Sequence, residues 1–235
     1  MKSKRLIISI FLIIISLLSI NLFKNNNIII INTSRKQIDE KYNYKETDQI
    51  NGTEIDNDDS NTVSDVIGKI IIKGTAIDEE IVQGTDNEFY LNHSISKKKN
   101  IQGSIFMDYR NNLDDRKLLI YGHNSKTLKK ALFHDLEKYL NSSFYNKNKY
   151  IELTLNNEKV TYEIFSVMII EEGNNHHMKI TFNDKEFMEY INWMENKSLY
   201  QTGVEVSTND KIITLQTCYY NPNNSYLIIN AKKIK

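Results

Sequence analysis

The pattern of apolar and polar residues divides the chain into an apolar run, a polar stretch and a segment of short apolar patches. Residues 6–23 carry no charge, and in helical conformation they would span roughly 27 Å, close to the hydrocarbon thickness of a bilayer. Residues 24–65 are polar, with little periodicity, and predict a polar extracellular tether. An ordered domain is predicted for residues 66–235.

The apolar run predicts a transmembrane signal-anchor. Lys2, Lys4 and Arg5 precede it, so the positive-inside rule places residues 1–5 in the cytoplasm and the ordered domain outside the cell. A cleaved signal peptide is one alternative, but the run is longer than a usual signal-peptide core and no Ala-x-Ala site follows it. A buried core helix is the other alternative, and unbroken apolarity at the extreme N-terminus argues against it.

The ordered segment predicts a mainly β domain with inserted helices. Short apolar or alternating runs predict strands at residues 68–72, 80–83, 104–107, 117–121, 150–155, 160–170, 211–217 and 226–232. The period becomes helical over residues 127–140, and Asn183 followed by Glu186 predicts a capped helix that runs through residue 197. Many short strands with two helices favour a β-barrel or an α+β domain over a doubly wound sheet.

Composition excludes several functional classes. The chain has 30 Lys+Arg against 30 Asp+Glu, which argues against a nucleic-acid binder because such proteins need a basic excess. The single cysteine excludes an intramolecular disulfide framework and a cysteine-rich zinc module. That thiol is either an inert packing residue or a reactive nucleophile.

Cys218 and His123 are the candidates for chemistry. Each ends a predicted strand just before a polar loop, where a scaffold presents side chains to a cleft. A neighbouring imidazolium lowers the pKa of a thiol, and the imidazole can protonate a leaving amine. The alternatives are a small buried cysteine and a hydrogen-bonded strand-end histidine, since spacing alone does not establish that the two residues meet.

The other histidines are weaker candidates. His176 and His177 are adjacent, so on a strand they would face opposite ways, and no metal site is expected there. His93 and His134 are expected to be solvated, as is the loop at residues 97–100. The order His before Cys also disfavours papain-like and related cell-wall peptidases, in which the cysteine comes first.

Three motifs together resemble one known family. Residues 81–111 contain IVQG, FYL and GSIFMDYRN, residues 118–124 read LLIYGHN, and residues 212–218 read IITLQTC. In this order and spacing they are similar to the class B sortases, from about residue 66 to the C-terminus. The resemblance implies an eight-stranded β-barrel with a helical insertion before the Cys-bearing strand, and membrane anchoring in a Gram-positive bacterium.

The resemblance also implies an activity. Sortases cleave a C-terminal sorting signal of surface proteins at its Thr and join the new carboxyl group to a peptidoglycan amine. Carried over by position, Cys218 is the nucleophile that forms a thioacyl intermediate and His123 is the acid/base, with no cofactor. Class B enzymes prefer Asn-Pro-x-Thr-type signals, although some clostridial members use other pentapeptides.

One position departs from the family pattern. Sortases carry an Arg on the strand after the cysteine, where it holds the substrate and stabilises the oxyanion. No Arg follows His123 in this chain, and Tyr226 occupies the family Arg position. Tyr226 can donate one neutral hydrogen bond but supplies no charge. Either Tyr226 substitutes, which we favour, or a lysine such as Lys232 or Lys233 reaches the site, or the enzyme is slow.

Two alternative functions follow from these features. The missing Arg motivates a catalytically degenerate sortase-like module that binds sorting signals without turnover. Hydrolysis is the default fate of a thioacyl intermediate when no amine arrives, which motivates a slow signal-cleaving cysteine protease. A transpeptidase that attaches surface proteins to peptidoglycan is the function that we favour, because the nucleophile and the base are both present.

Overall fold

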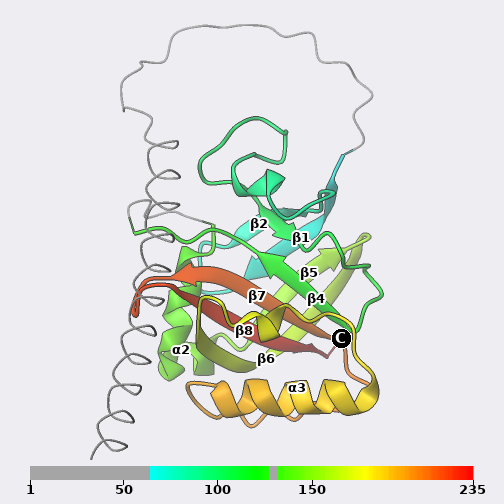
Figure 1. The fold of residues 1–235 in the computed structure, drawn as a ribbon, viewed down its shortest axis with the longest axis vertical. Coiled ribbons are helices and arrows are strands. Elements are labelled where there is room, and N and C mark those ends of the chain that lie inside the picture. Colours follow the sequence, from blue (N-terminus) through cyan, green and yellow to red (C-terminus); the bar gives the residue numbers. More distant parts are fainter. Residues whose placement is uncertain (1–63, 127–131, 235) are drawn as a thin grey trace, which may run out of the picture. The chain divides into compact units, whose positions relative to one another are not determined.

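A computed structural model describes residues 64–126 and 132–234 (Figure 1). The predicted cytoplasmic tip (1–5), the predicted signal-anchor (6–23) and nearly all of the predicted tether (24–65) lie outside the described residues. Among the residues that are described, no helix has the length and apolar character needed to cross a bilayer.

Within the described ranges, eight strands close into a barrel. They are β1 (Val66–Ile72), β2 (Asp78–Val82), β3 (Ile105–Met107), β4 (Lys117–Tyr121), β5 (Tyr150–Leu155), β6 (Glu158–Glu171), β7 (Ile212–Tyr219) and β8 (Ser225–Lys233). Around the barrel the order is β1-β2-β3-β4-β7-β8-β6-β5, and β5 pairs again with β1. All neighbours are antiparallel except β2 with β3 and β4 with β7, which are parallel.

The eight-stranded β-barrel confirms the fold class, and every predicted strand is present. The boundaries of β4 and β5 coincide with those predicted, and the other strands differ by one or two residues. β7 extends to Tyr219, so Cys218 lies inside the strand rather than at its end. β4 ends at Tyr121, so His123 lies two residues beyond its strand.

The predicted capped helix is confirmed as α3 (Asp184–Lys197). The Glu186 backbone N–H donates to Asn183 Oδ1 at 2.9 Å, and the Asn183 backbone N–H donates to Glu186 Oε2 at 3.0 Å. These reciprocal bonds form a capping box, which satisfies two backbone donors at the helix start. α3 packs against β6 on the outside of the barrel (Figure 1).

The helix predicted over residues 127–140 is partly wrong. Residues 127–131 lie outside the described residues, and residues His134–Leu140 form a 3₁₀ helix, η2, instead of an α-helix. Phe133, Leu136 and Tyr139 are fully buried at a spacing of three, which matches the three residues per turn of a 3₁₀ helix. A short helix, α2 (Ser142–Lys147), follows, and the Asn141 side chain caps it.

Both faces of the sheet around β7 are buried, and this decides which way Cys218 points. Ile213 and Leu215 lie in the cluster that fills the barrel interior. Ile212 lies in a second cluster, beneath α3. Because side chains alternate along a strand, Gln216 and Cys218 share the face of Ile212. Cys218 therefore faces away from the barrel interior.

The barrel is self-contained. Residues Asn61–Lys235 form one compact unit, and because the ladder returns to β1, the described strands leave no open sheet edge. The interior cluster and the cluster beneath α3 both lie within this unit. The fragment Asn61–Lys235 therefore contains what the barrel needs to fold.

Replacing Asn183 by Ala removes the side-chain acceptor of the capping box. We expect the free energy of unfolding to fall by about 1 kcal/mol, measured by urea denaturation of the fragment Asn61–Lys235. The matched control is Asn196→Ala, at an exposed position of the same helix. Alanine is the better helix former there, so the control should be neutral or slightly stabilising. An equal loss in both variants would contradict the cap assignment.

Candidate active site

The parallel pairing of β4 with β7 aligns the two predicted site residues. Tyr121 lies opposite Gln216 at the end of this ladder, and the same register continued by two residues sets His123 beside Cys218. The Gly122 backbone N–H donates to the Gln216 carbonyl at 3.2 Å, which prolongs the pairing beyond the strand. Chain segments that are 95 residues apart in the sequence therefore run side by side here.

Side chains of both segments hold this register. Thr217 Oγ1 donates to the Gly122 carbonyl at 2.7 Å, and Asn124 Nδ2 donates to the Cys218 carbonyl at 3.0 Å. A Cβ at Gly122 would lie 2.6 Å from the Phe133 ring, so only glycine allows β4 to continue past this buried side chain. In the GHN sequence, Gly122 and Asn124 therefore have structural roles.

His123 is oriented by a neighbouring loop. Its Nε2 lies 2.6 Å from the carbonyl oxygen of Leu91, the last residue of the 3₁₀ helix η1 (Phe89–Leu91). A carbonyl only accepts hydrogen bonds, so Nε2 carries a proton. In the neutral ring the lone pair is then on Nδ1, which is the nitrogen able to accept a proton from a thiol.

Cys218 is half-buried. Burial raises the pKa of its thiol above the ordinary value, and the negative charge of Glu172 raises it further. The protonated thiol is therefore favoured when no substrate is bound, and attack by sulfur requires a base to remove the proton.

Tyr226 lies directly opposite Cys218 in the antiparallel β7–β8 ladder. Side chains at such paired positions have their Cβ atoms about 4.5–5.5 Å apart. Burial, followed by the charges of Glu172 and Cys218, raises the pKa of the Tyr226 hydroxyl. The phenol therefore stays protonated at neutral pH and can donate a hydrogen bond next to the sulfur.

Known proteins resemble this chain in sequence and in fold. Residues 70–234 match the family described as Sortase domain. The chain is 32% identical over 175 residues to Sortase B of Staphylococcus aureus, covering 73% of this chain and 71% of that protein. It is 35% identical over 157 residues to Sortase B of Listeria monocytogenes, covering 66% and 63% respectively. The chain belongs to the sortase family.

Solved structures place this sortase in class B. The X-ray structure of Clostridium perfringens sortase B is 39% identical with a TM-score of 0.68, and the match covers 73% of this chain and 94% of that one. A Staphylococcus aureus sortase B-substrate complex is 32% identical with a TM-score of 0.67, covering 73% and 80%. The protein is therefore a cysteine transpeptidase of the sortase B type.

The lysines considered as substitutes for the family arginine lie at the wrong end of the sheet. Lys232 pairs with Ile212, six residues before Cys218 on β7, which corresponds to about 20 Å along the strand. Its ammonium donates to the Glu205 carbonyl at 2.7 Å. The Lys233 backbone N–H donates to the Lys211 carbonyl at the same end. The alternative in which Lys232 or Lys233 reaches the site therefore disagrees with the structure.

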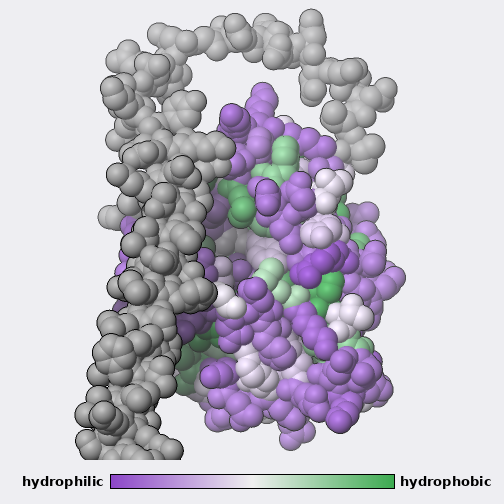
Figure 2. Space-filling model, viewed as in Figure 1, coloured by the Kyte–Doolittle hydropathy of each residue, from purple (hydrophilic) through white to green (hydrophobic). Residues whose placement is uncertain are grey.

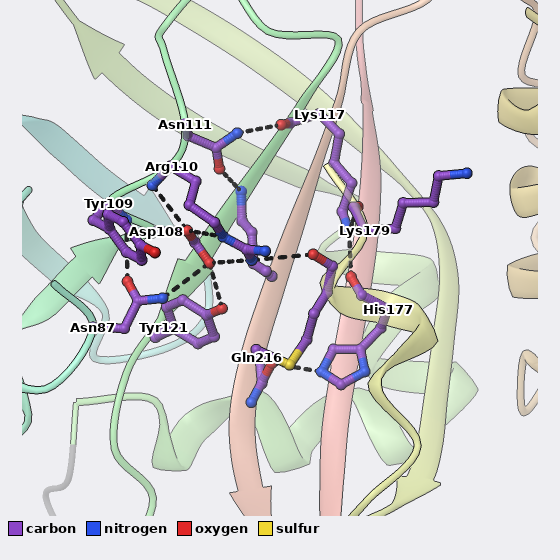
Figure 3. Close-up of polar contacts among 12 residues, drawn as sticks. Asn87, Asp108, Tyr109, Arg110, Asn111, Lys117, Tyr121, His177, Lys179 and Gln216 are labelled. Carbon is purple, nitrogen blue, oxygen red and sulfur yellow. Dashed lines mark hydrogen bonds and ion pairs between the residues drawn. The ribbon is translucent and has the colours of Figure 1, made fainter. Parts of the chain in front are cut away.

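Arg110 of this sortase is committed to a buried carboxylate. Its Nε and Nη2 donate to the two oxygens of Asp108 at 2.8 and 2.7 Å, and Nη2 also donates to the Met178 carbonyl at 3.1 Å (Figure 3). Burial opposes ionisation of Asp108, but hydrogen bonds from Arg110 and Tyr121 outweigh it and lower the pKa of Asp108 to about 2. The motif DYRN therefore encodes a structural ion pair.

Arg116, the other arginine of the domain, is also engaged elsewhere. Its Nη2 pairs with Asp184 at 2.7 Å, at the start of α3, and its guanidinium lies 4.8 Å from the centre of the Phe187 ring. Neither arginine therefore supplies a positive charge beside Cys218.

A buried lysine, missed in the sequence, fixes the loop before α3. Lys117 is fully buried, and its ammonium donates to the carbonyls of His177 and Lys179 (Figure 3). It also donates to the Tyr190 hydroxyl. Burial lowers the pKa of Lys117, while Asp108 opposes this effect. Three oxygen acceptors match the three protons of an ammonium group. The cluster ties the 3₁₀ helix η3 (Asn175–Met178) to β4.

His177 connects this loop to the strand that carries Cys218. The residue is fully buried, with Nδ1 3.0 Å from the Asn174 carbonyl and Nε2 2.7 Å from the Gln216 side chain. Its ring centre lies 5.8 Å from that of Tyr226. Burial is the main cause that lowers the pKa of His177, to about 4. A neutral histidine therefore packs beside the position of the family arginine.

The remaining histidines differ from expectation in one respect. His93 and His134 are not simply solvated. The ring of His93 stacks on that of Phe89, with 4.0 Å between the ring centres, and Nδ1 of His134 lies 2.8 Å from Asn124 Oδ1. His176 and His177 lie in the short 3₁₀ helix η3, within the loop between β6 and α3. In the part of the chain that the structure describes, no group of three or more His, Cys, Asp or Glu residues is arranged to hold a metal.

A pocket lies between the loops that follow β4 and β7. It measures about 390 Å³ and is lined by Ser125, Lys126, His134, Glu137, Tyr219, Tyr220 and Asn221. Asn124 connects one wall of this pocket to β7, because its Nδ2 donates both to Glu137 Oε1 at 2.5 Å and to the Cys218 backbone carbonyl.

His177 should make the stability of the protein sensitive to acid. Its pKa is lowered from 6.5 to about 4 in the folded state, so as the pH falls below about 6.5 the unfolded chain binds the proton first and stability is lost. Between pH 7 and pH 5 this loss should be about 2 kcal/mol. In the His177→Gln variant, the free energy of unfolding, measured by urea denaturation at several pH values, should fall by about 2 kcal/mol less over this pH range than in the unmodified protein. An equal fall in both proteins would contradict the assignment to His177.

Proposed function

We propose that this sortase cleaves the C-terminal sorting signal of surface proteins at its Thr and transfers the protein to an amine of peptidoglycan or its precursor. The observation that carries the proposal is the β4–β7 register, in which His123 follows one strand at the level of Cys218 on the other. Membership of the sortase B group supports the same chemistry.

The proposed reaction needs only side chains. His123 accepts the proton of Cys218 through Nδ1, and the sulfur attacks the carbonyl carbon of the Thr. The tetrahedral intermediate collapses as the peptide C–N bond breaks, and His123 returns the proton to the leaving amine. An acceptor amine then attacks the thioester, loses a proton to His123 and releases Cys218 as a thiol. No cofactor enters these steps.

Tyr226 is proposed to stabilise the oxyanion in place of the family arginine. Its hydroxyl remains protonated and lies across the ladder from Cys218, which suits a hydrogen bond to an oxygen on the attacked carbon. A neutral donor stabilises negative charge less than a guanidinium does, because charge-assisted hydrogen bonds are about twice as strong. The proposal therefore includes a lower rate than that of an arginine-bearing sortase.

The proposed location is the outer face of the cell membrane. The sequence of residues 6–23 supports a single-pass signal-anchor with residues 1–5 in the cytoplasm, residues 24–65 as a tether and residues 66–235 as an extracellular catalytic domain. Sorting-signal-bearing proteins leaving the cell and membrane-bound peptidoglycan precursors would both reach a domain held there.

The central test is formation of a covalent intermediate. The fragment Asn61–Lys235 is incubated with a panel of sorting-signal peptides that includes Asn-Pro-x-Thr types, and mass spectrometry follows the protein. An adduct equal in mass to the peptide up to its Thr is expected, and Cys218→Ala and His123→Ala should abolish it. If the peptides are cleaved but no Cys218-dependent adduct forms, the thioacyl route is excluded.

The same assay separates the alternative functions. Adding peptidoglycan stem or cross-bridge peptides should produce a ligated product. Cleavage without ligation would favour a protease. Binding of a signal peptide that is unchanged in Cys218→Ala, with no cleavage by the unmodified protein, would favour a degenerate binding module.

Variants of Tyr226 test the oxyanion proposal. Tyr226→Phe removes the hydroxyl and keeps the ring, so kcat/KM for peptide cleavage should fall by about 10²-fold, mainly through kcat. Tyr226→Arg restores the family residue and should raise the rate above that of the unmodified protein. The control is Tyr150→Phe, at an exposed position on β5. Full activity of the Tyr226→Phe variant would contradict the role of the hydroxyl.

A further inference from the structure

The loop between β2 and β3 contains a structured finger, residues 92–101. The Ser94 backbone N–H donates to the Lys98 carbonyl at 2.8 Å, and the Asn100 backbone N–H donates to the Asn92 carbonyl at 2.9 Å. Lys97 takes the left-handed conformation that closes the turn, with φ of 61°. This loop projects from the upper end of the domain in Figure 1.

The finger exposes basic and apolar side chains together. Lys97, Lys98 and Lys99 are consecutive and exposed, and the finger contains no acidic residue. Ile101 is 75% exposed and Ile95 is 44% exposed. In the space-filling view, hydrophobic patches lie among hydrophilic residues at this end of the domain (Figure 2). Burial does not explain these isoleucines, and within the described residues no ion pair neutralises Lys98 or Lys99.

The finger lies where the chain enters the domain. Lys97 Nζ pairs with Asp65 Oδ1 at 3.2 Å, and the Tyr90 hydroxyl donates to the other oxygen of Asp65 at 2.7 Å. Asp65 is the second residue that the structure describes and the last of the predicted tether. A domain anchored through residues 6–23 would therefore have this finger beside its point of attachment.

We propose that the finger docks on an anionic lipid surface, with Lys98 and Lys99 against the headgroups and Ile95 and Ile101 in the interfacial layer. Clustered lysines near such a surface add attraction through charge, and flanking apolar side chains add it through burial. A soluble polyanion would leave both isoleucines in water, so the composition of the finger favours lipid. The physiological setting rests on the proposed membrane location, whereas the binding itself does not.

Docking would also orient the active site. Leu91, whose carbonyl holds His123 Nε2, directly precedes the finger. The finger root is fixed to the domain, because Ser104 Oγ donates to the His93 carbonyl at 2.8 Å and His93 stacks on Phe89. A surface-bound finger would thus set the height and tilt of the histidine side of the cleft above the membrane.

The test is vesicle binding by the fragment Asn61–Lys235, which lacks residues 6–23. Co-sedimentation should show binding to phosphatidylglycerol vesicles, little binding to phosphatidylcholine vesicles and weakening by salt. Lys98→Glu/Lys99→Glu should weaken binding at least about tenfold, and Ile101→Ser several-fold. The matched control, Lys73→Glu/Lys185→Glu, makes the same charge change at exposed positions outside the finger. Thermal unfolding verifies that each variant is folded.

Three results would overturn the proposal. They are no binding to phosphatidylglycerol vesicles, an equal loss in the control variant, and full vesicle binding by Ile101→Ser with equally tight binding to soluble polyphosphate. The last result would assign the lysines to a soluble polyanion. Peptide cleavage is measured separately in solution, so failure of the proposed activity and failure of docking are read from different assays.

Discussion

The parallel pairing of β4 with β7 is the constraint on which the rest of the structure depends. Both strands are buried on their two faces, and their register alone sets the histidine segment beside the cysteine segment. Thr217, Gly122 and Asn124 extend this register past the end of the ladder through hydrogen bonds and a close approach. A shift by one residue would turn every side chain of β7 to the other face and send the sulfur into the barrel.

The electrostatics of the cleft follow from where the cations are used. Arg110 is held by Asp108 and Arg116 by Asp184, so the guanidinium groups stabilise loops around the sheet. Opposite the cysteine lies the phenol of Tyr226, which packs against the neutral imidazole of His177, and the charge of Glu172 raises the pKa of both Cys218 and Tyr226. These surroundings favour the uncharged form of the thiol.

The sequence was sufficient to predict the strands and α3, because alternation, capping and turn residues are local signals. It was insufficient wherever the partners are distant backbone atoms. Lys117 begins an apolar strand, and no residue near it in the sequence indicates that its acceptors are the backbone carbonyls of His177 and Lys179, some sixty residues away. The 3₁₀ helix η2 was read as an α-helix because apolar residues at a spacing of three satisfy both patterns over one turn. The lysine alternative failed because it ignored position along the strand.

The cluster around Lys117 also has a consequence for how such a chain can diverge. The ammonium group and the Tyr190 hydroxyl satisfy each other and share the His177 carbonyl. Losing either residue alone leaves a buried polar group without its partner, and exchanging both for apolar residues would leave the His177 carbonyl without either donor. The two positions are therefore coupled in evolution: a relative that retains the lysine is expected to retain the tyrosine.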